Sequence, residues 1–218
     1  SLSPRGERAG VRGASSSSFL EAKFDRTLTP AERSEAKRLI ARMLRLNEDE
    51  SHTKGFHRAD PRWKKSGRAR LFRSPTLFED VIKTVTSCNV AWPSTVNMNK
   101  QMVRHLGKGG CFPTEARVSR TRVGTLRGRC GVGYRDQRII DLAKLFHRGE
   151  IDEGWLEHPD TPDDEVFDFL KSLPGIGPYA AGNIMMLLGR YSRLAIDTET
   201  VRHGKAALGF TGTERQII

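Results

Sequence analysis

The sequence has few cysteines, little strand-like alternation and no long apolar run. Its three cysteines, Cys88, Cys111 and Cys130, are widely spaced and odd in number, so we expect no disulfide framework, and a reducing compartment fits better. No Cys-x-x-Cys pair or Cys/His cluster has the spacing of metal ligands, which argues against a zinc or iron–sulfur site in this segment. No apolar run is long enough to span a bilayer.

Acidic residues are outnumbered by basic ones. The chain has 37 Lys and Arg against 26 Asp and Glu, which gives a formal net charge of +11 over 218 residues. A folded domain with this balance usually binds a polyanion, and nucleic acid is the commonest one. An anionic membrane surface is the rival partner, but no basic amphipathic segment dominates the sequence. The charge therefore indicates a class of partner and not a function.

Helical patterns follow one another along most of the chain, so we predict an all-α fold. Capping boxes at Thr29–Glu32 and Thr76–Glu79 mark the starts of two helices. Ser94 is expected to cap a third helix, which should end near Gly107. Residues 135–147 form an amphipathic pattern typical of a further helix.

Other segments lack such patterns. Residues 47–73 are polar and are predicted to form a long connection. Residues 1–22 are rich in Arg, Ser and Gly, and we expect a disordered arm, with an organellar transit remnant or a cloning scar as alternatives. No internal repeat or clear linker divides the rest, so residues 23–218 are predicted to form one domain.

A turn rich in Pro and Gly, Leu173–Tyr179, lies between two helical patterns. The first helix should end near Ser172, and the second should begin at Pro178, whose fixed φ suits a first helical turn. Gly175 and Gly177 allow a tight turn and leave backbone N–H groups uncovered, which together with the positive end of the second helix can seat a phosphate. An ordinary αα-hairpin explains the turn alone equally well.

The second helix should stop at Gly189, and an irregular link then leads to Leu194–Thr198. Asp197 follows an apolar triplet at the start of another helical pattern, so we expect its carboxylate at a core edge that faces a cleft. A plain N-cap is the commoner use of such an aspartate. The two uses are compatible because a capped carboxylate is held ionised and oriented.

The string LPGIGPYAAGNI, followed by AIDTETVR, strongly resembles the helix-hairpin-helix and aspartate signature of base-excision DNA glycosylases. The likeness extends to Thr86–Asn89, and Cys130–Arg135 is similar to the GYR element of 8-oxoguanine DNA glycosylases. It covers roughly residues 70–210 and is nearest to the 8-oxoguanine and endonuclease III-like enzymes. The resemblance implies two helical lobes that flank a cleft.

This resemblance implies that Asp197 is the catalytic carboxylate, which would stabilise an oxocarbenium-like sugar and could activate water. Tyr179 falls where bifunctional relatives carry a Schiff-base lysine. A phenol cannot form an imine, so the resemblance implies a monofunctional hydrolase without an efficient β-lyase step. The hairpin residues that would bind DNA are Gly175, Ile176, Gly177 and Pro178.

Three further residues match positions that contact DNA in the family. Asn89 would fill the gap left by a flipped base, Tyr134 would wedge beside the orphaned partner base, and Arg135 would contact that base. The plainer alternatives are a half-buried core aromatic for Tyr134 and a surface cation for Arg135.

The family also implies a structural cation. The backbone carbonyls of Lys171, Leu173 and Ile176 match positions that hold a monovalent or calcium-like ion, which would fix the hairpin. The Lys171 side chain itself is expected to be solvated. We expect no other cofactor, and no iron–sulfur cluster in this segment.

Three departures from the 8-oxoguanine enzymes concern substrate choice. Ser94 stands where they carry an arginine that reads the orphaned base, and Glu199 stands where many relatives carry histidine. The sequence has 21 residues after Asp197, so we expect the C-terminal helices that complete their base pocket to be missing, by truncation, or differently built. The sequence therefore does not identify the base.

The leading hypothesis is a monomeric glycosylase whose partner is double-stranded DNA with a damaged or mismatched base, and no membrane. The arginines expected to line the DNA flank are Arg117, Arg120, Arg122, Arg127, Arg129, Arg135 and Arg138. The alternative is a non-catalytic helix-hairpin-helix module, although such a module has no need for Asp197. RNA binding fits less well because no aromatic-rich strand is present. We expect a nuclear protein, with an organelle or the bacterial cytoplasm as alternatives.

Overall fold

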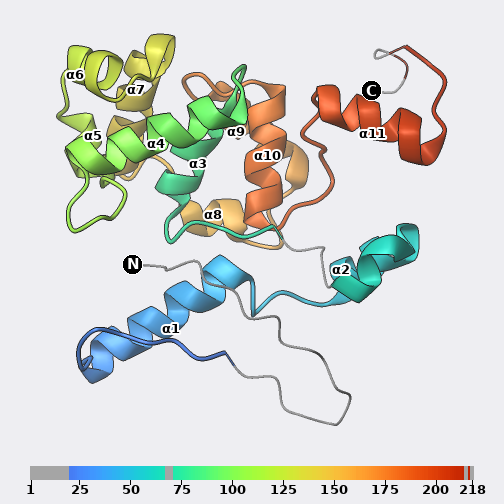
Figure 1. Ribbon diagram of the computed structural model, residues 1–218, viewed down its shortest axis with the longest axis horizontal. Helices are drawn as coiled ribbons and strands as arrows, with labels where there is room; N and C mark the ends of the chain where they lie inside the picture. Colours follow the sequence, from blue (N-terminus) through green and yellow to red (C-terminus); the bar gives the residue numbers. More distant parts are fainter. Residues whose placement is uncertain (1–19, 67–70, 214–215, 217–218) are drawn as a thin grey trace. The chain divides into compact units, whose positions relative to one another are not determined.

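The computed structural model describes residues 20–66, 71–213 and 216, and Figure 1 shows its helices. The elements in chain order are α1 Pro30–Leu44, α2 Ser51–Ala59, η1 Pro61–Ser66, α3 Leu77–Ser87, α4 Trp92–Leu106, α5 Glu115–Ser119, α6 Val123–Arg129, η2 Gly133–Arg135, α7 Asp136–His147, α8 Glu153–Glu157, α9 Asp163–Ser172, α10 Pro178–Leu188 and α11 Thr198–Leu208. No strand occurs in these described ranges, so the all-α prediction is confirmed. None of these helices is long and apolar enough to cross a membrane.

The chain divides into two units, Ser1–Ala36 and Lys37–Ile218. Most of the arm predicted at 1–22 lies outside the described residues. In the first unit the predicted capping box at the start of α1 is confirmed: Thr29 N–H donates to Glu32 Oε2 at 2.9 Å, and Glu32 N–H donates to Thr29 Oγ1 at 3.3 Å. Hydrogen bonds from Arg26 and Thr29 lower the pKa of Glu32 to about 2.

In the second unit, α3 is the most deeply buried element. Thr76 Oγ1 accepts from Glu79 N–H at 3.2 Å, which confirms the second capping box. The predicted apolar face of α3 is at most 4% exposed and consists of Leu77, Phe78, Val81, Ile82 and Val85. Helices α4, α7 and α10 pack against it. Burial of this face supplies the hydrophobic stabilisation around which the other helices assemble.

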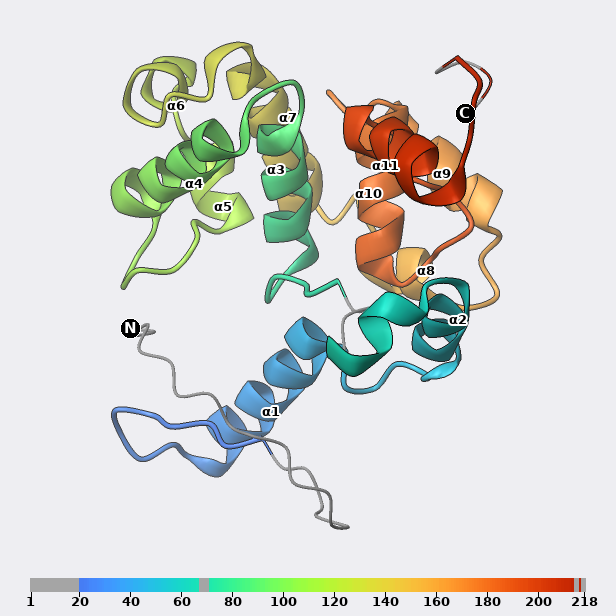
Figure 2. The same ribbon diagram turned by 45° about the vertical axis from the view of Figure 1, so that its right-hand side comes forward.

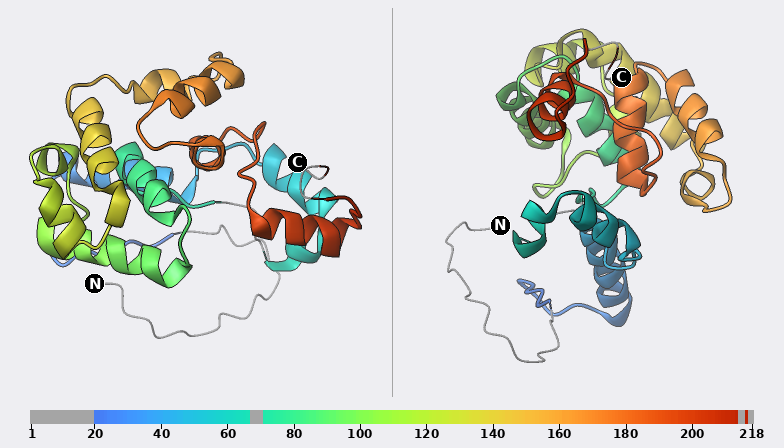
Figure 3. Two further views of the ribbon diagram at one scale, coloured as in Figure 1. Left: turned by 90° about the horizontal axis from the view of Figure 1, so that it is seen from above. Right: turned by 90° about the vertical axis from the view of Figure 1, so that its right-hand side faces the viewer.

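The helices of this unit form two groups on either side of α3. Figure 2 shows α4–α6 on one side of α3, α7 behind it and α9–α11 on the other side, and the view from above in Figure 3 shows α10 between α3 and α11. The prediction of two helical lobes agrees with this arrangement.

Two sequence-based expectations about helix positions are wrong. Helix α4 begins at Trp92 with Ala91 as its N-cap, so Ser94 lies within the first turn and donates its N–H to Ala91 O at 2.9 Å. Pro93 explains the earlier start, because its fixed φ and missing N–H suit the first turn. The predicted end of this helix at Gly107 is confirmed.

The polar segment 47–73 was expected to be a connection, but it contains α2 and η1. Sequence patterns do not predict α2 because it is short and mostly polar, with Phe56 as its one large apolar side chain, and it buries none of its residues. One contact of α2 is aromatic: the ring centroids of His52 and Tyr191 lie 4.8 Å apart. The short α8 was also not predicted.

A buried arginine joins the segment after α1 to the end of α10. The Arg45 side chain is 1% exposed, and its Nη2 donates to the carbonyl oxygens of Met186 and Leu187 at 2.5 and 2.7 Å. It also pairs with Glu48. The last carbonyls of a helix lack an intrahelical partner, so Arg45 supplies a donor to Leu187 O and a second donor to Met186 O, which also accepts from Gly189 N–H at 3.2 Å.

We predict that Arg45→Met lowers the free energy of unfolding by about 3 kcal/mol, because the carbonyls and Glu48 lose their buried partner. Urea unfolding followed by circular dichroism measures this change. Arg104→Met, at an exposed position on α4, is the control and should change stability by less than about 0.5 kcal/mol. Equal effects of the two substitutions would contradict the role given to Arg45.

Candidate active site

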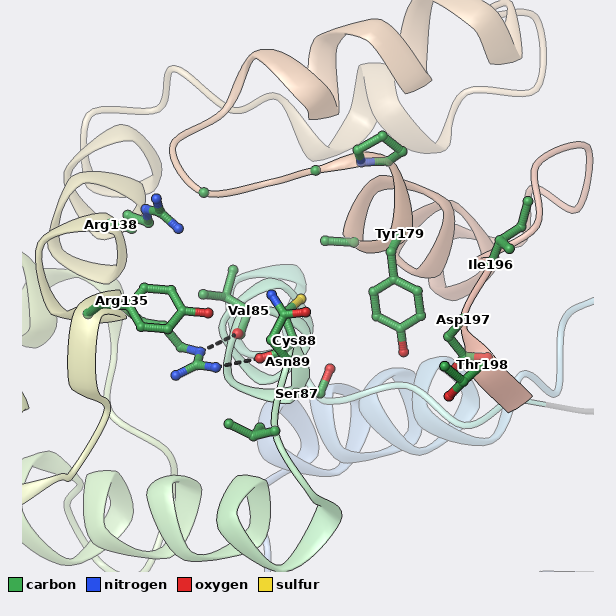
Figure 4. A pocket seen from close by; sticks show the side chains of 16 residues that line it. Val85, Ser87, Cys88, Asn89, Arg135, Arg138, Tyr179, Ile196, Asp197 and Thr198 are labelled. Carbon is green, nitrogen blue, oxygen red and sulfur yellow. Dashed lines mark hydrogen bonds between the residues drawn. The ribbon is translucent and has the colours of Figure 1, made fainter. Parts of the chain in front are cut away.

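A cavity of about 660 Å³ opens in the second unit (Figure 4). Four segments line it: the end of α3 with the turn after it, η2 with the start of α7, the hairpin with the start of α10, and residues 196–198. The sequence-predicted site residues that line it are Asn89, Tyr134, Arg135, Gly175, Gly177, Pro178, Tyr179 and Asp197. Ile176 is 5% exposed and anchors the hairpin in the core, and Lys171 and Leu173 also lie outside the lining.

The hairpin has the predicted bounds. Helix α9 ends at Ser172, and α10 begins at Pro178 after the N-cap Gly177. Ile176 N–H donates to Leu173 O at 3.2 Å across the turn, and Gly175 has a φ of +79°, which favours glycine. Gly175 and Gly177 carry no side chain, and both line the cavity. The turn therefore offers bare backbone and the positive end of α10 to an anion.

Asp197 caps α11 and also lines the cavity. Its Oδ1 accepts from Thr200 N–H at 2.8 Å and from Thr200 Oγ1 at 3.0 Å, while its own N–H donates to Thr200 Oγ1 at 3.3 Å. Oδ2 has no hydrogen-bond partner among the described residues. The cap thus orients one carboxylate oxygen and leaves the other for a ligand.

Gly182 allows the chain before Asp197 to pass close to α10. A Cβ at Gly182 would lie 2.9 Å from Leu194 O and 3.1 Å from Ala195 N, both backbone atoms. Only glycine fits without a backbone shift. The sequence carries a signal for this contact, because a glycine inside an apolar helix costs about 1 kcal/mol relative to alanine and needs a packing reason.

Tyr179 brings a phenol beside the carboxylate. Burial raises its pKa, the charge of Asp197 raises it further, and a hydrogen bond with Ser87 opposes the shift. Its hydroxyl points toward Asp197 in the close view of Figure 4. The phenol therefore remains protonated at neutral pH, and it can donate a hydrogen bond but cannot act as an amine.

Arg135 is 5% exposed, so the alternative of a surface cation is wrong. Its side chain donates to Val85 O at 3.2 Å and to Cys88 O, drawn as dashed lines in Figure 4. The third nitrogen, Nη1, donates to Val132 O at 3.4 Å. These bonds join η2 to the end of α3.

Asn89 and Tyr134 extend from the two segments that Arg135 joins. Asn89 has a φ of +54°, an uncommon conformation that asparagine tolerates better than most residues. Tyr134 is 54% exposed, so it is not a half-buried core aromatic. Its ring centroid lies 4.4 Å from Cζ of Arg135 and 5.5 Å from Cζ of Arg138. Two cation–π contacts hold this exposed ring in place.

The remaining charged positions differ in exposure. Glu199 pairs with Arg202 at 2.5 Å, which offsets the negative charge that departs from the family pattern. The Lys171 ammonium is exposed and pairs with Asp168 at 3.3 Å. Of the arginines expected along a DNA flank, all except Arg135 are exposed.

Sequence reasoning assigned no individual site role to Ser87, Cys88 or Gly182.

We predict that Gly182→Ala destabilises the protein by about 1–3 kcal/mol, because the new methyl group meets backbone that must move. The matched control is Gly128→Ala on α6, where a Cβ meets nothing within 4 Å and the change should stabilise by up to about 1 kcal/mol. Urea unfolding of both variants shows whether each substitution lowers or raises the free energy of unfolding. A stabilised Gly182→Ala protein would mean that residues 194–195 do not pack on α10 as described.

No protein-family model and no curated protein matches the chain. Among solved structures, the 8-oxoguanine glycosylase/lyase of Clostridium acetobutylicum is 22% identical with a TM-score of 0.68, over 84% of this chain and 68% of that one. That enzyme has also been solved with double-stranded DNA containing cytosine opposite 8-oxoguanine.

Two similar structures come from other glycosylases. The 3-methyladenine DNA glycosylase of Archaeoglobus fulgidus is 20% identical with a TM-score of 0.68, over 88% of this chain and 69% of that one. The DNA-3-methyladenine glycosidase of Bacillus halodurans is 21% identical with a TM-score of 0.59, over 78% and 79% of the two chains. The predicted fold is thereby confirmed: this chain has the helical fold of the helix-hairpin-helix DNA glycosylases.

Proposed function

We propose that the protein is a monofunctional DNA glycosylase, which flips a damaged or mismatched base from duplex DNA and hydrolyses its N-glycosidic bond. The observation that carries the proposal is the capped carboxylate of Asp197, with one oxygen open, in the same cavity as the bare hairpin backbone. The shared fold supports it, since the similar structures are DNA glycosylases.

Each part of the cavity has a task in this reaction. The hairpin holds a phosphate of the damaged strand, and Asn89 and Tyr134 occupy the space that the extruded base leaves in the duplex. As the bond from C1′ to the base nitrogen breaks, the base departs with the electron pair and the sugar becomes positive. The open oxygen of Asp197 stabilises that charge. Water then adds at C1′, and the proton that it loses passes to the departed base, which leaves an abasic site and the free neutral base.

The monofunctional assignment rests on Tyr179. A lyase step needs an amine that attacks C1′ and forms an imine. Tyr179 offers a protonated phenol beside Asp197 instead, and it can hydrogen bond to the sugar or to the attacking water. The reaction therefore stops at the abasic site.

A structural cation at the hairpin remains a proposal. The carbonyls of Lys171 and Leu173 belong to the last turn and C-cap of α9, where helix carbonyls lack intrahelical partners and can ligate a hard cation. Leu173 O accepts the Ile176 N–H at 3.2 Å and keeps a second lone pair. The turn therefore fits an ion held by these carbonyls and that of Ile176, which would make the hairpin more rigid.

The second candidate is a DNA-holding module without catalysis. The hairpin alone would serve such a module. The oriented carboxylate favours the enzyme. An anion beside DNA weakens binding, so a protein that only holds DNA gains nothing from Asp197, whereas a glycosylase needs it for the reaction.

We predict that wild-type protein cleaves one or more members of a panel of duplexes after alkali treatment, and that Asp197→Asn lowers this activity at least about 100-fold. The panel carries 8-oxoguanine, uracil, thymine opposite guanine, hypoxanthine or a 3-methyladenine analogue. Asp152→Asn is the matched control, because Asp152 also caps a helix, accepting from Trp155 N–H at 3.1 Å, and does not line the cavity. Binding without cleavage of any duplex would favour the module.

We predict that Tyr179→Lys gains strand cleavage without alkali on the duplex that the wild type recognises, because an amine then faces C1′. Borohydride should trap the imine as a covalent protein–DNA adduct that is visible on a denaturing gel. Tyr179→Phe is the control and should form no adduct. Cleavage without alkali by the wild type would contradict the monofunctional assignment.

A further inference from the structure

Arg138, one of the arginines expected along a DNA flank, is a charged residue of the cavity to which the proposed reaction gives no specific contact. It lies in the first turn of α7, and its side chain is exposed and lines the cavity. Figure 4 shows Arg135 and Arg138 on one side of the cavity and Tyr179 and Asp197 on the other. The guanidinium of Arg138 is thus separated from the carboxylate that the proposed reaction uses.

The stem of Arg138 packs on the hairpin. A Cβ at Gly175 would lie 2.6 Å from Cδ, 3.2 Å from Cβ and 3.3 Å from Cγ of Arg138. Three carbons of the side chain therefore lie against the bare Cα of Gly175. The contact fixes where the guanidinium can reach, which reduces the entropy lost when it binds a ligand.

The donors of Arg138 are available. Arg138 forms no ion pair or hydrogen bond with any residue in the described ranges, and its Cζ lies 5.5 Å from the centroid of the Tyr134 ring. Its neighbours differ in this respect: Arg135 donates to three carbonyls, and Arg127 pairs with Asp136 at 2.6 Å. Arg138 is therefore a charged donor at the hairpin that no described protein group satisfies.

We propose that Arg138 and the hairpin backbone together bind one DNA phosphate. This inference rests on the proposed function and adds a residue to the DNA-binding site of the protein. Guanidinium binds phosphate through two parallel charge-assisted hydrogen bonds, which neutral amides cannot supply. A phosphate is favoured over a base edge because the Arg138 stem packs on the hairpin, and the hairpin backbone itself lines the cavity. Through the Tyr134 ring, the same residue connects phosphate binding to the side chain proposed as the wedge.

The test measures binding to a duplex with a tetrahydrofuran abasic analogue, by fluorescence anisotropy over a range of NaCl concentrations. We expect Arg138→Gln to weaken binding about ten-fold at low salt and to reduce the slope of log K against log [NaCl] by about one. The loss should be equal for all four bases opposite the analogue, because a phosphate contact carries no sequence information. Arg148→Gln is the matched control, since Arg148 is exposed at the far end of α7, pairs with Glu150 and does not line the cavity.

Other results would overturn the inference. A loss that depends on the opposite base, with an unchanged salt slope, would assign Arg138 to a base edge. Binding by Arg138→Gln equal to wild type, with glycosylase activity intact, would remove this inference and leave the proposed function standing. Failure of the wild type to bind any duplex would remove both.

Discussion

The hydrogen bonds from Arg135 to the end of α3 determine how the cavity is built, because they join two segments that are distant in sequence. Val85 and Cys88 are the acceptors, and the Arg135 side chain is buried between α3 and η2. Asn89 and Tyr134 extend from the joined segments toward the same cavity. A buried guanidinium with satisfied donors holds such a junction more rigidly than apolar contact alone, since each bond fixes a direction.

Charge is divided within this cavity. The guanidinium groups of Arg135 and Arg138 lie on one side, and the carboxylate and phenol of Asp197 and Tyr179 lie on the other. A polyanion bound along the basic side would leave the reacting sugar opposite the acidic side. The separation avoids an ion pair between Arg138 and Asp197, which would neutralise both groups before DNA arrives.

Local features could be predicted from the sequence, and distant contacts could not. The capping boxes, the hairpin bounds and the Asp197 cap each involve residues within about one helical turn. Residues that are close in sequence therefore determine these features. The burial of Arg135 depends on carbonyls 50 and 47 residues away, and the packing of Arg138 on Gly175 joins α7 to the hairpin turn. Helix α2 is not predicted because it is short and mostly polar and has a single large apolar side chain, Phe56, too little to distinguish a helix from a polar connection.

Helix α10 has a geometric consequence for any DNA substrate. It begins at the hairpin, and the chain to Asp197 crosses it at Gly182, within its first two turns. In the proposed function, the distance from a phosphate bound at the hairpin to the Asp197 carboxylate would therefore be set by a few residues of α10, a rigid helix with about 1.5 Å and 100° per residue. Such an enzyme would act at a constant number of nucleotides from that phosphate. The helix would then determine which nucleotide position reacts, independently of which base is removed.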